Sequence, residues 1–180
     1  MKIVFITNYL PPKSGGIERF THEFANSLVQ NGHDVLVITN NWKGDESSIQ
    51  TLVTDYEYIT LDAFSVANRL PIPKFYKINN IRKYLRTSKK TEIVIFQSHL
   101  FISHLVWLFK FRNVSKKVWI NHSADFINFE NRIMTQIGFY YEKFMIHIMR
   151  KNTNIYLAQS ETCAKWIQSK TGKQFKPINN

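Results

Sequence analysis

The sequence has little of what marks secreted or membrane-spanning proteins. Its 180 residues include one cysteine, Cys163, which excludes an internal disulfide framework and favours a reducing, cytoplasmic setting. We expect Cys163 to be a buried, inert thiol, because it lies in the predicted helix SETCAKWI. The opening apolar run, KIVFIT, is shorter than the hydrophobic region of a signal peptide.

Long hydrophobic runs are also missing. The longest stretch without a charged residue is 93–109, whereas a spanning helix needs about 20 predominantly apolar residues. Polar side chains interrupt this stretch at Gln97, Ser98, His99, Ser103 and His104. The pattern therefore predicts a buried strand followed by a mostly buried helix.

Several catalytic signatures do not occur. The glycine pair Gly15–Gly16 fits neither the GxGxxG fingerprint nor a Walker loop, because no GK[ST] follows. There is no GxSxG elbow. His99 and His104 do not share a helical face and have no carboxylate at ligand spacing, so we expect no metal site and no cofactor.

Acidic residues are scarce in one region. The net charge is +11, and residues 69–90 contain eight basic residues and no acidic one. Such a block favours anionic lipid, nucleic acid or a phosphorylated substrate, and a solvated basic face is the plain alternative. No nucleic-acid-binding motif is present, so we expect no nucleic acid partner.

What the chain does contain is a regular alternation of strand and helix patterns. Strands are predicted at 2–8, 35–39, 56–61, 92–97, 117–121 and 154–159, with a half-strand in FKPINN. Helices are predicted from Ile17 to the NGHD turn and at 75–88, 99–110, 128–150 and 161–171, with Gly32 and Gly172 closing two of them and Ser160 capping the last. The two prolines of SVANRLPIPK predict an irregular segment.

This alternation predicts an α/β fold. We expect one Rossmann-like domain over residues 1–180, with a doubly wound, mostly parallel sheet of six to seven strands and helices on both faces. Ligands of such sheets bind outside the carboxyl ends of the strands. The candidate contacts at those ends are Asn8, His99, His122, Asp125 and Ser160.

The loop after the first strand, YLPPKSGGIERF, is a further candidate. Gly15 and Gly16 would let the backbone approach a ligand closely, and the helix from Ile17 would offer free N–H groups and a positive dipole end to an anion. A plain tight turn would use the same glycine pair.

Together these segments resemble the N-terminal domain of the family 4 glycosyltransferases, which have the GT-B fold. The matching segments are KIVFITNYLPPKSGGIERF, LVQNGHDVLVIT, IFQSH, VWINHSADF, IYLAQSE and KPINN. The resemblance implies a hexosyltransferase-type enzyme that moves a sugar from a nucleotide-diphosphate sugar to a glycan or lipid-linked acceptor, with retention and without a metal or other cofactor. It also implies that the nucleotide lies mainly in a C-terminal domain absent from this chain, which we expect to be inactive alone.

The resemblance also implies residue roles. It places Gly15 and Gly16 near the donor diphosphate and sugar, and His122 near the transferred sugar as the catalytic candidate. Asp125 becomes an acceptor contact, and Glu18 caps or orients the helix after the loop.

Family members that act on lipid-linked acceptors often rest on the cytoplasmic membrane. The resemblance therefore suggests that basic side chains hold the protein on an anionic membrane surface, namely Lys74, Lys77, Arg82, Lys83, Arg86, Lys89 and Lys90. The aromatic stretch 126–144 fits either core packing or an interfacial helix. A non-catalytic domain that binds a ligand or partner is the alternative to an enzyme.

Overall fold

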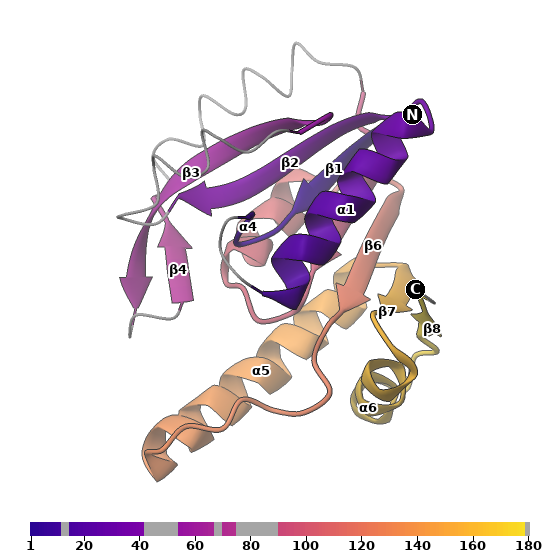
Figure 1. Cartoon of the computed structure of the whole chain (residues 1–180). Helices are drawn as coiled ribbons and strands as arrows, with labels where there is room; N and C mark the ends of the chain where they lie inside the picture. The colour runs from indigo at the N-terminus through magenta and orange to yellow at the C-terminus, as the bar shows by residue number, and fades with distance from the viewer. Residues whose placement is uncertain (12–14, 42–53, 67–69, 75–89, 179–180) are drawn as a thin grey trace.

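One mixed sheet forms the centre of the molecule (Figure 1). The computed structural model describes residues 1–11, 15–41, 54–66, 70–74 and 90–178. Within these ranges eight strands lie in the order β4-β3-β2-β1-β5-β6-β7-β8. Every neighbouring pair is parallel except β3 and β4, which are antiparallel.

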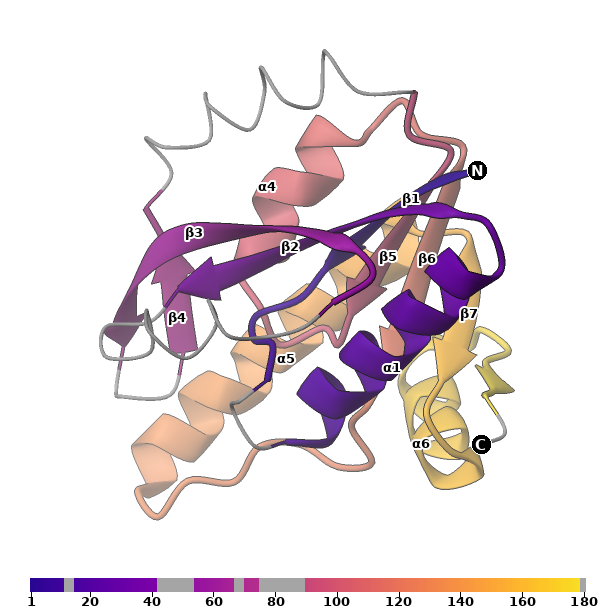
Figure 2. The ribbon, with the colours of Figure 1, turned by 45° about the horizontal axis from the view of Figure 1, so that its top comes forward.

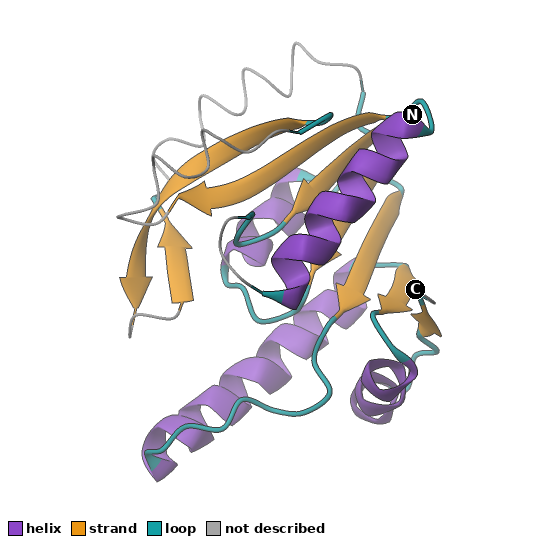
Figure 3. Cartoon of the chain, in the orientation of Figure 1, coloured by secondary structure: helices purple, strands orange, loops and turns teal. Residues whose placement is uncertain are grey.

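Strands and helices alternate along most of the chain, as Figure 3 shows by colour. The strands are β1 (Lys2–Ile6), β2 (Asp34–Asn41), β3 (Glu57–Val66), β4 (Leu70–Pro73), β5 (Ile93–Gln97), β6 (Lys116–Asn121), β7 (Ile155–Ala158) and β8 (Lys176–Pro177). The helices are α1 (Gly16–Gln30), α4 (Ser103–Lys110), α5 (Arg132–Asn152) and α6 (Glu161–Thr171).

The core lies on both faces of the sheet. On β1, Val4 and Ile6 join the cluster that includes residues of α4, α5 and α6, while Ile3 and Phe5 join the cluster packed against α1. Figure 2 shows α1 on one side of the sheet and α4 and α5 on the other. Because both faces are covered, all five residues of β1 are buried, and the predicted fold class is confirmed.

Several boundaries differ from the prediction. Residues 70–73 form the edge strand β4 instead of an irregular segment, because proline is tolerated at a sheet edge. Helix α5 begins later than predicted because the Asn131 side chain accepts from the backbone N–H groups of Ile133 and Met134. The predicted helix at 75–88 lies outside the described residues.

The order of the strands indicates where a ligand crevice is expected. The chain runs outward from β1 through β2 to β3 and later returns to β5 on the other side of β1. At such a switch point the connections on the two sides diverge, which leaves space beyond the carboxyl ends of the strands. The crevice expected from this strand order lies beyond the ends of β1 and β5.

Candidate functional site

Polar side chains meet where four neighbouring strands end. Asn8 follows β1, Gln97 closes β5, His122 follows β6 and Gln159 follows β7. These strands are adjacent in the order β1, β5, β6, β7, so the four side chains lie along one edge of the sheet.

His122 is the centre of this group. Its Nδ1 lies 3.1 Å from Gln159 Oε1, and its Nε2 lies 2.5 Å from Gln97 Oε1. The ring also meets the edge of Phe20 from α1, with ring centroids 5.3 Å apart. Three separate elements therefore fix the orientation of the imidazole.

The environment keeps this imidazole neutral. Burial lowers the pKa of His122 from 6.5 to about 4, and the hydrogen bond between its ring and Gln159 Oε1 opposes that shift. A neutral imidazole has one N–H and one lone pair, so one of the two amides must present its NH2 group to the ring. Gln97 Nε2 is buried without a hydrogen-bond partner, so a turned Gln97 amide satisfies both groups.

The glycine pair borders the same group. Gly16 opens α1 and is exposed, and a methyl group added to it would lie 3.8 Å from Gln159 Nε2. The N–H groups of the first helical turn have no acceptor within the helix. The sequence predicted that Gly16 and His122 lie at the same edge of the sheet, and in the structure both lie next to Gln159 at that edge.

Gly15 has a different neighbour. A methyl group there would lie 2.0 Å from Glu18 Oε2, so the carboxylate of Glu18 lies over this glycine. The Gly15 backbone is extended, with φ −178°, and space rather than backbone strain favours glycine at this position. Glu18 is buried. The pKa of Tyr9 is raised to about 12, chiefly by the burial of Tyr9 and to a smaller extent by the charge of Glu18.

Asn8 and His99 lie inside the protein. Asn8 Oδ1 accepts from Asn40 Nδ2 at 2.9 Å and from the Ser103 hydroxyl at 3.4 Å, so Asn8 ties β1 to β2 and α4. His99 is fully buried, and its Nε2 lies 3.8 Å from Glu142 Oε1. The structure does not bring His99 to His122, and its ligand contact stays a prediction.

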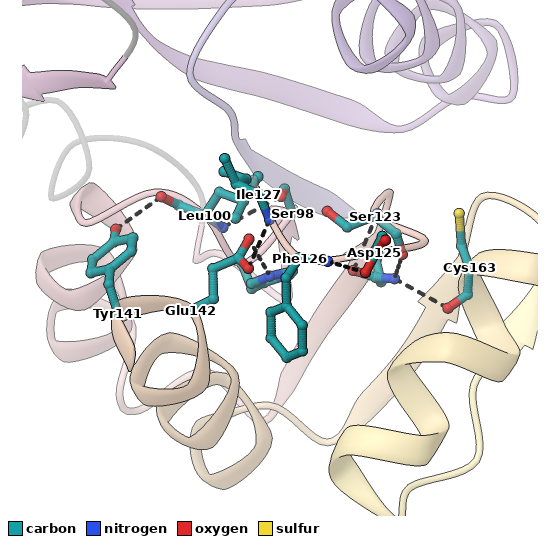
Figure 4. Close-up of polar contacts among 11 residues, drawn as sticks. Ser98, Leu100, Ser123, Asp125, Phe126, Ile127, Tyr141, Glu142 and Cys163 are labelled. Atoms are coloured by element: carbon teal, nitrogen blue, oxygen red, sulfur yellow. Dashed lines mark hydrogen bonds and ion pairs between the residues drawn. The ribbon is translucent and has the colours of Figure 1, made fainter. Parts of the chain in front are cut away.

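The segment 122–131 between β6 and α5 is held from two sides (Figure 4). The backbone N–H of Ile127 donates to Glu142 Oε2 at 3.1 Å. Nearer β6, Asn121 Nδ2 donates to the carbonyl oxygens of Ser123 and Cys163 at 2.7 and 3.2 Å. Asp125 lies between these anchors, exposed, and accepts from the Phe126 N–H at 2.7 Å.

The remaining predicted residues are at other places. Ser160 is the exposed N-cap of α6 and accepts from the Cys163 N–H at 3.2 Å, as the prediction of a cap required. Lys74 is half-buried and Lys90 is exposed. The other basic residues predicted to meet a membrane fall outside the described ranges: Lys77, Arg82, Lys83, Arg86 and Lys89.

Gln159 and Phe20 were missed by the sequence prediction. The predicted last strand included Gln159, but β7 ends at Ala158, so the first residue beyond the strand is Gln159 rather than Ser160. No site role was predicted for Phe20. Both residues contact His122.

The described residues lack two further features. No three His, Cys, Asp or Glu side chains within the described ranges are grouped so as to hold a metal ion. No helix in the described part of the chain combines the length and apolar character that crossing a bilayer requires.

Comparisons with known proteins agree on the fold. The family model described as Glycosyltransferase Family 4 matches residues 14–179, whereas no curated protein matches the sequence. Among solved structures, a sucrose-phosphate synthase from Thermosynechococcus elongatus is similar with a TM-score of 0.65 and 13% identity, over 99% of this chain and 48% of that one. A UGT transferase from Siraitia grosvenorii in complex with UDP is similar with a TM-score of 0.59 and 11% identity, over 99% and 50%. The chain thus spans about half the length of these structures.

Proposed function

The chain belongs to glycosyltransferase family 4, and on that basis we propose that it is the acceptor-binding half of an enzyme that transfers a sugar from a nucleotide-diphosphate sugar to a glycan. The acceptor in this proposal is a lipid-linked intermediate of a cell-envelope or capsular glycan. The transfer is of the hexosyl type, retains the anomeric configuration and needs no metal. The nucleotide binds mainly to a second domain outside these 180 residues, so that this chain alone is inactive.

One observation carries the proposal. The exposed start of α1, the Gln159 amide and the neutral His122 ring lie side by side at the edge of the sheet. Free N–H groups at a helix start suit a diphosphate, and the Gln159 amide beside the neutral His122 ring suits a sugar hydroxyl. The diphosphate and the sugar of the donor thus meet complementary groups that lie next to each other.

In this proposal the protein acts by positioning and by electrostatic stabilisation. The first turn of α1 faces the leaving diphosphate, whose negative charge grows as the bond to the sugar breaks. His122 lies beside the transferred sugar, orients the Gln159 amide through its Nδ1, and adds no charge of its own. The exposed Asp125 contacts the acceptor from the 122–131 segment.

We further propose that the protein works at the inner face of the cell membrane. Residues 69–90 carry eight basic and no acidic side chains, and each basic side chain near an anionic leaflet is worth about 1 kcal/mol. Such a location would bring the crevice to a lipid-linked acceptor.

The test is a transfer assay with the complete product of the gene. It is incubated with radiolabelled nucleotide-diphosphate sugars and a lipid extract of the source cells, and label is expected to move into the lipid fraction. The 180-residue chain is the control and is expected to give no product. Turnover by that chain alone would refute the need for a second domain.

A second outcome would refute the enzyme itself. If the complete product consumes no sugar donor from the panel, but binds a glycan or protein, the non-catalytic binding domain is the correct function.

A further inference from the structure

Both nitrogens of the His122 ring already have partners within the protein. Nδ1 lies 3.1 Å from Gln159 Oε1, and Nε2 lies 2.5 Å from Gln97 Oε1. Phe20 packs against the same ring, with ring centroids 5.3 Å apart. A neutral imidazole has one N–H and one lone pair, and the two amides use both of them. A ligand beside His122 therefore meets a ring with no nitrogen free for a further hydrogen bond.

The pairing of β6 and β7 places Gln159 next to His122. Asn121 of β6 is paired with Ala158 of β7, so His122 and Gln159 are the next residues beyond the two strand ends. The backbone N–H of Gln159 donates to the Asn121 carbonyl at 2.9 Å, and the His122 carbonyl accepts from the Cys163 thiol at 3.5 Å. Backbone contacts thus hold both residues, and their side-chain contact follows from the register of the sheet.

Two arrangements of hydrogens can satisfy the imidazole. In the first, Nδ1–H donates to Gln159 Oε1, and Nε2 accepts from a turned Gln97 amide. In the second, Nε2–H donates to Gln97 Oε1, and the Gln97 NH2 group stays buried without a partner. A buried N–H group without an acceptor is rarer in proteins than a carbonyl oxygen without a donor. The first arrangement is therefore favoured.

The first arrangement gives the Gln159 amide one direction. Its oxygen accepts from His122, so its NH2 group points away from the ring. A methyl group added to Gly16 would lie 3.8 Å from this NH2 nitrogen, which places the NH2 group beside the start of α1. Gln159 is half-buried, and the N–H groups of the first helical turn have no acceptor within the helix. A ligand at this place meets donors from both elements.

We propose that Gln159 makes the hydrogen bond to the transferred sugar, and that His122 is a positioning residue that acts through it. This inference rests on the proposed function, since it takes the donor diphosphate to lie on the first turn of α1. The Gln159 NH2 group donates to a hydroxyl oxygen of the adjoining sugar. His122 holds the amide in the donating direction and makes no hydrogen bond to the sugar itself.

The same geometry makes Gln159 a specificity residue. An NH2 group only donates, so the sugar must offer an acceptor such as a hydroxyl oxygen. A sugar without a hydroxyl at this position would leave the NH2 group unpaired, and sites built to pair a hydroxyl discriminate strongly against analogues that lack it. We therefore expect a deoxy sugar of this kind to bind less tightly than its parent.

The first test measures the affinity of the complete product of the gene for sugar donors by titration calorimetry. The probes are the nucleotide-diphosphate sugars of the transfer assay, among them UDP-glucose and GDP-mannose, each beside its free nucleoside diphosphate. Gln159→Met keeps the length of the side chain and removes the NH2 group. The affinity for the nucleotide sugar should fall by about three- to tenfold, while the affinity for the free nucleoside diphosphate should not change. The matched control is Gln168→Met, the same change at an exposed residue of α6, which should bind as the original protein does.

The second test measures how His122 depends on Gln159. His122→Leu frees the amide to turn, so the affinity for the nucleotide sugar should fall by no more than in Gln159→Met. The double variant should bind no more weakly than Gln159→Met alone, because both changes remove the same hydrogen bond. His122→Asn should recover most of the affinity, because asparagine Nδ2 is bonded to Cγ as histidine Nδ1 is and can donate to Gln159 Oε1. Thermal unfolding of each variant checks that its fold is retained.

The direction of the amide has a readout that needs no sugar donor. Nitrogen NMR of the 180-residue chain distinguishes a ring nitrogen that carries a hydrogen from one that does not. Near pH 7 we expect the hydrogen of His122 on Nδ1. The signal of this ring is the one that His122→Asn removes.

Four results would overturn the proposal. A hydrogen on Nε2 would mean that Gln159 presents its oxygen to the ligand. Additive losses in the double variant would show that His122 contacts the sugar directly. An equal loss of affinity for the free nucleoside diphosphate would assign Gln159 to the diphosphate, and full binding of the nucleotide sugar by Gln159→Met would remove it from the site. If the original protein binds no nucleotide sugar, the proposed function fails and the sugar contact with it, while the ring hydrogen still shows whether His122 orients the amide.

Discussion

At the scale of single residues, the buried His104 and the half-buried His122 share one neighbour. The carbonyl of Gln97 accepts from His104 Nε2 at 2.9 Å, while the side-chain amide of Gln97 contacts His122. Burial lowers the pKa of both rings to about 4. Both imidazoles are therefore neutral near pH 7. Gln97 contacts His104 inside the protein through its backbone and His122 at the edge of the sheet through its side chain.

We predict a loss of stability in mild acid that depends on His122. Its pKa rises from about 4 to its ordinary 6.5 on unfolding, so the unfolded chain binds more protons between these values. The contribution of His122 is full above pH 6.5 and is lost as the pH falls, by about 1.4 kcal/mol per pH unit. Urea unfolding of the original protein and of His122→Gln checks this. The difference in their free energies of unfolding should vary with pH below 6.5 and be constant above it, and two parallel curves would contradict the prediction.

We predict that Gly16→Ala weakens binding of the sugar donor without lowering the stability of the fold. The added methyl group would make only an ordinary contact, 3.8 Å from Gln159 Nε2, and alanine favours a helix over glycine by about 0.5–1 kcal/mol. The variant should unfold at the same or a higher temperature. In the complete product its donor affinity should fall severalfold, because the methyl group occupies the space that the diphosphate needs. Unchanged affinity, measured by calorimetry, would remove Gly16 from the donor site.

The sequence located part of this site. The rule that ligands lie beyond strand ends gave His122 and the glycine pair as candidates, because the buried strands before them identify that edge, and their roles stay predictions. It failed for Gln159, where the end of the strand was misplaced by one residue. It also failed to predict the burial of His99, because Ser98 has a φ of 64°, a rare conformation for a residue other than glycine that redirects the following side chain. No pattern in the sequence marks Ser98 for this conformation.

At the scale of elements, α5 positions the 122–131 segment as well as covering the sheet. The Glu142 carboxylate accepts from the Ile127 N–H, and the Tyr141 hydroxyl donates to the Leu100 carbonyl at 2.9 Å. One turn of α5 therefore holds the connections that follow both β5 and β6. The positions of these two connections at the carboxyl ends of the strands therefore depend on α5.

We predict that Glu142→Leu loosens that edge. The change leaves the Ile127 N–H without its acceptor and the buried His99 without its carboxylate neighbour, at a cost of about 1–3 kcal/mol for each buried group. Hydrogen exchange at the Ile127 amide should become faster, and the free energy of unfolding should fall. The matched control is Glu161→Leu, which removes an exposed i,i+4 ion pair with Lys165 worth about 0.5 kcal/mol or less. A loss no greater than that of the control would show that Glu142 does not hold the segment.

Elements whose burial is uniform were the easiest to predict. Runs such as IVFI and VLVI are apolar at every position, as a strand covered on both faces must be. The start of α5 and the existence of β4 depend instead on a single side-chain cap and on pairing with β3. Neither is visible in the hydrophobic pattern.

At the scale of the whole molecule, the position of β1 at the centre of the sheet determines where the crevice lies. The sheet grows from β1 in both directions, so that residues as far apart in sequence as Gly16 and Gln159 become neighbours. The alternation of strands and helices predicted this layout. The antiparallel pairing of β3 and β4 was not predicted, since it requires a short connection rather than a helix.

The two prolines of β4 have a consequence for how this protein behaves when concentrated. The N–H of Lys74 donates to the Asp62 carbonyl of β3 at 2.6 Å, so by alternation the nitrogens of Pro71 and Pro73 face the opposite way, toward the side of β4 where the described residues form no further strand. A proline nitrogen carries no hydrogen to donate. A strand from another molecule that approached this side would meet gaps in the ladder it needs. The outermost strand thus completes the sheet and also resists templating of aggregates.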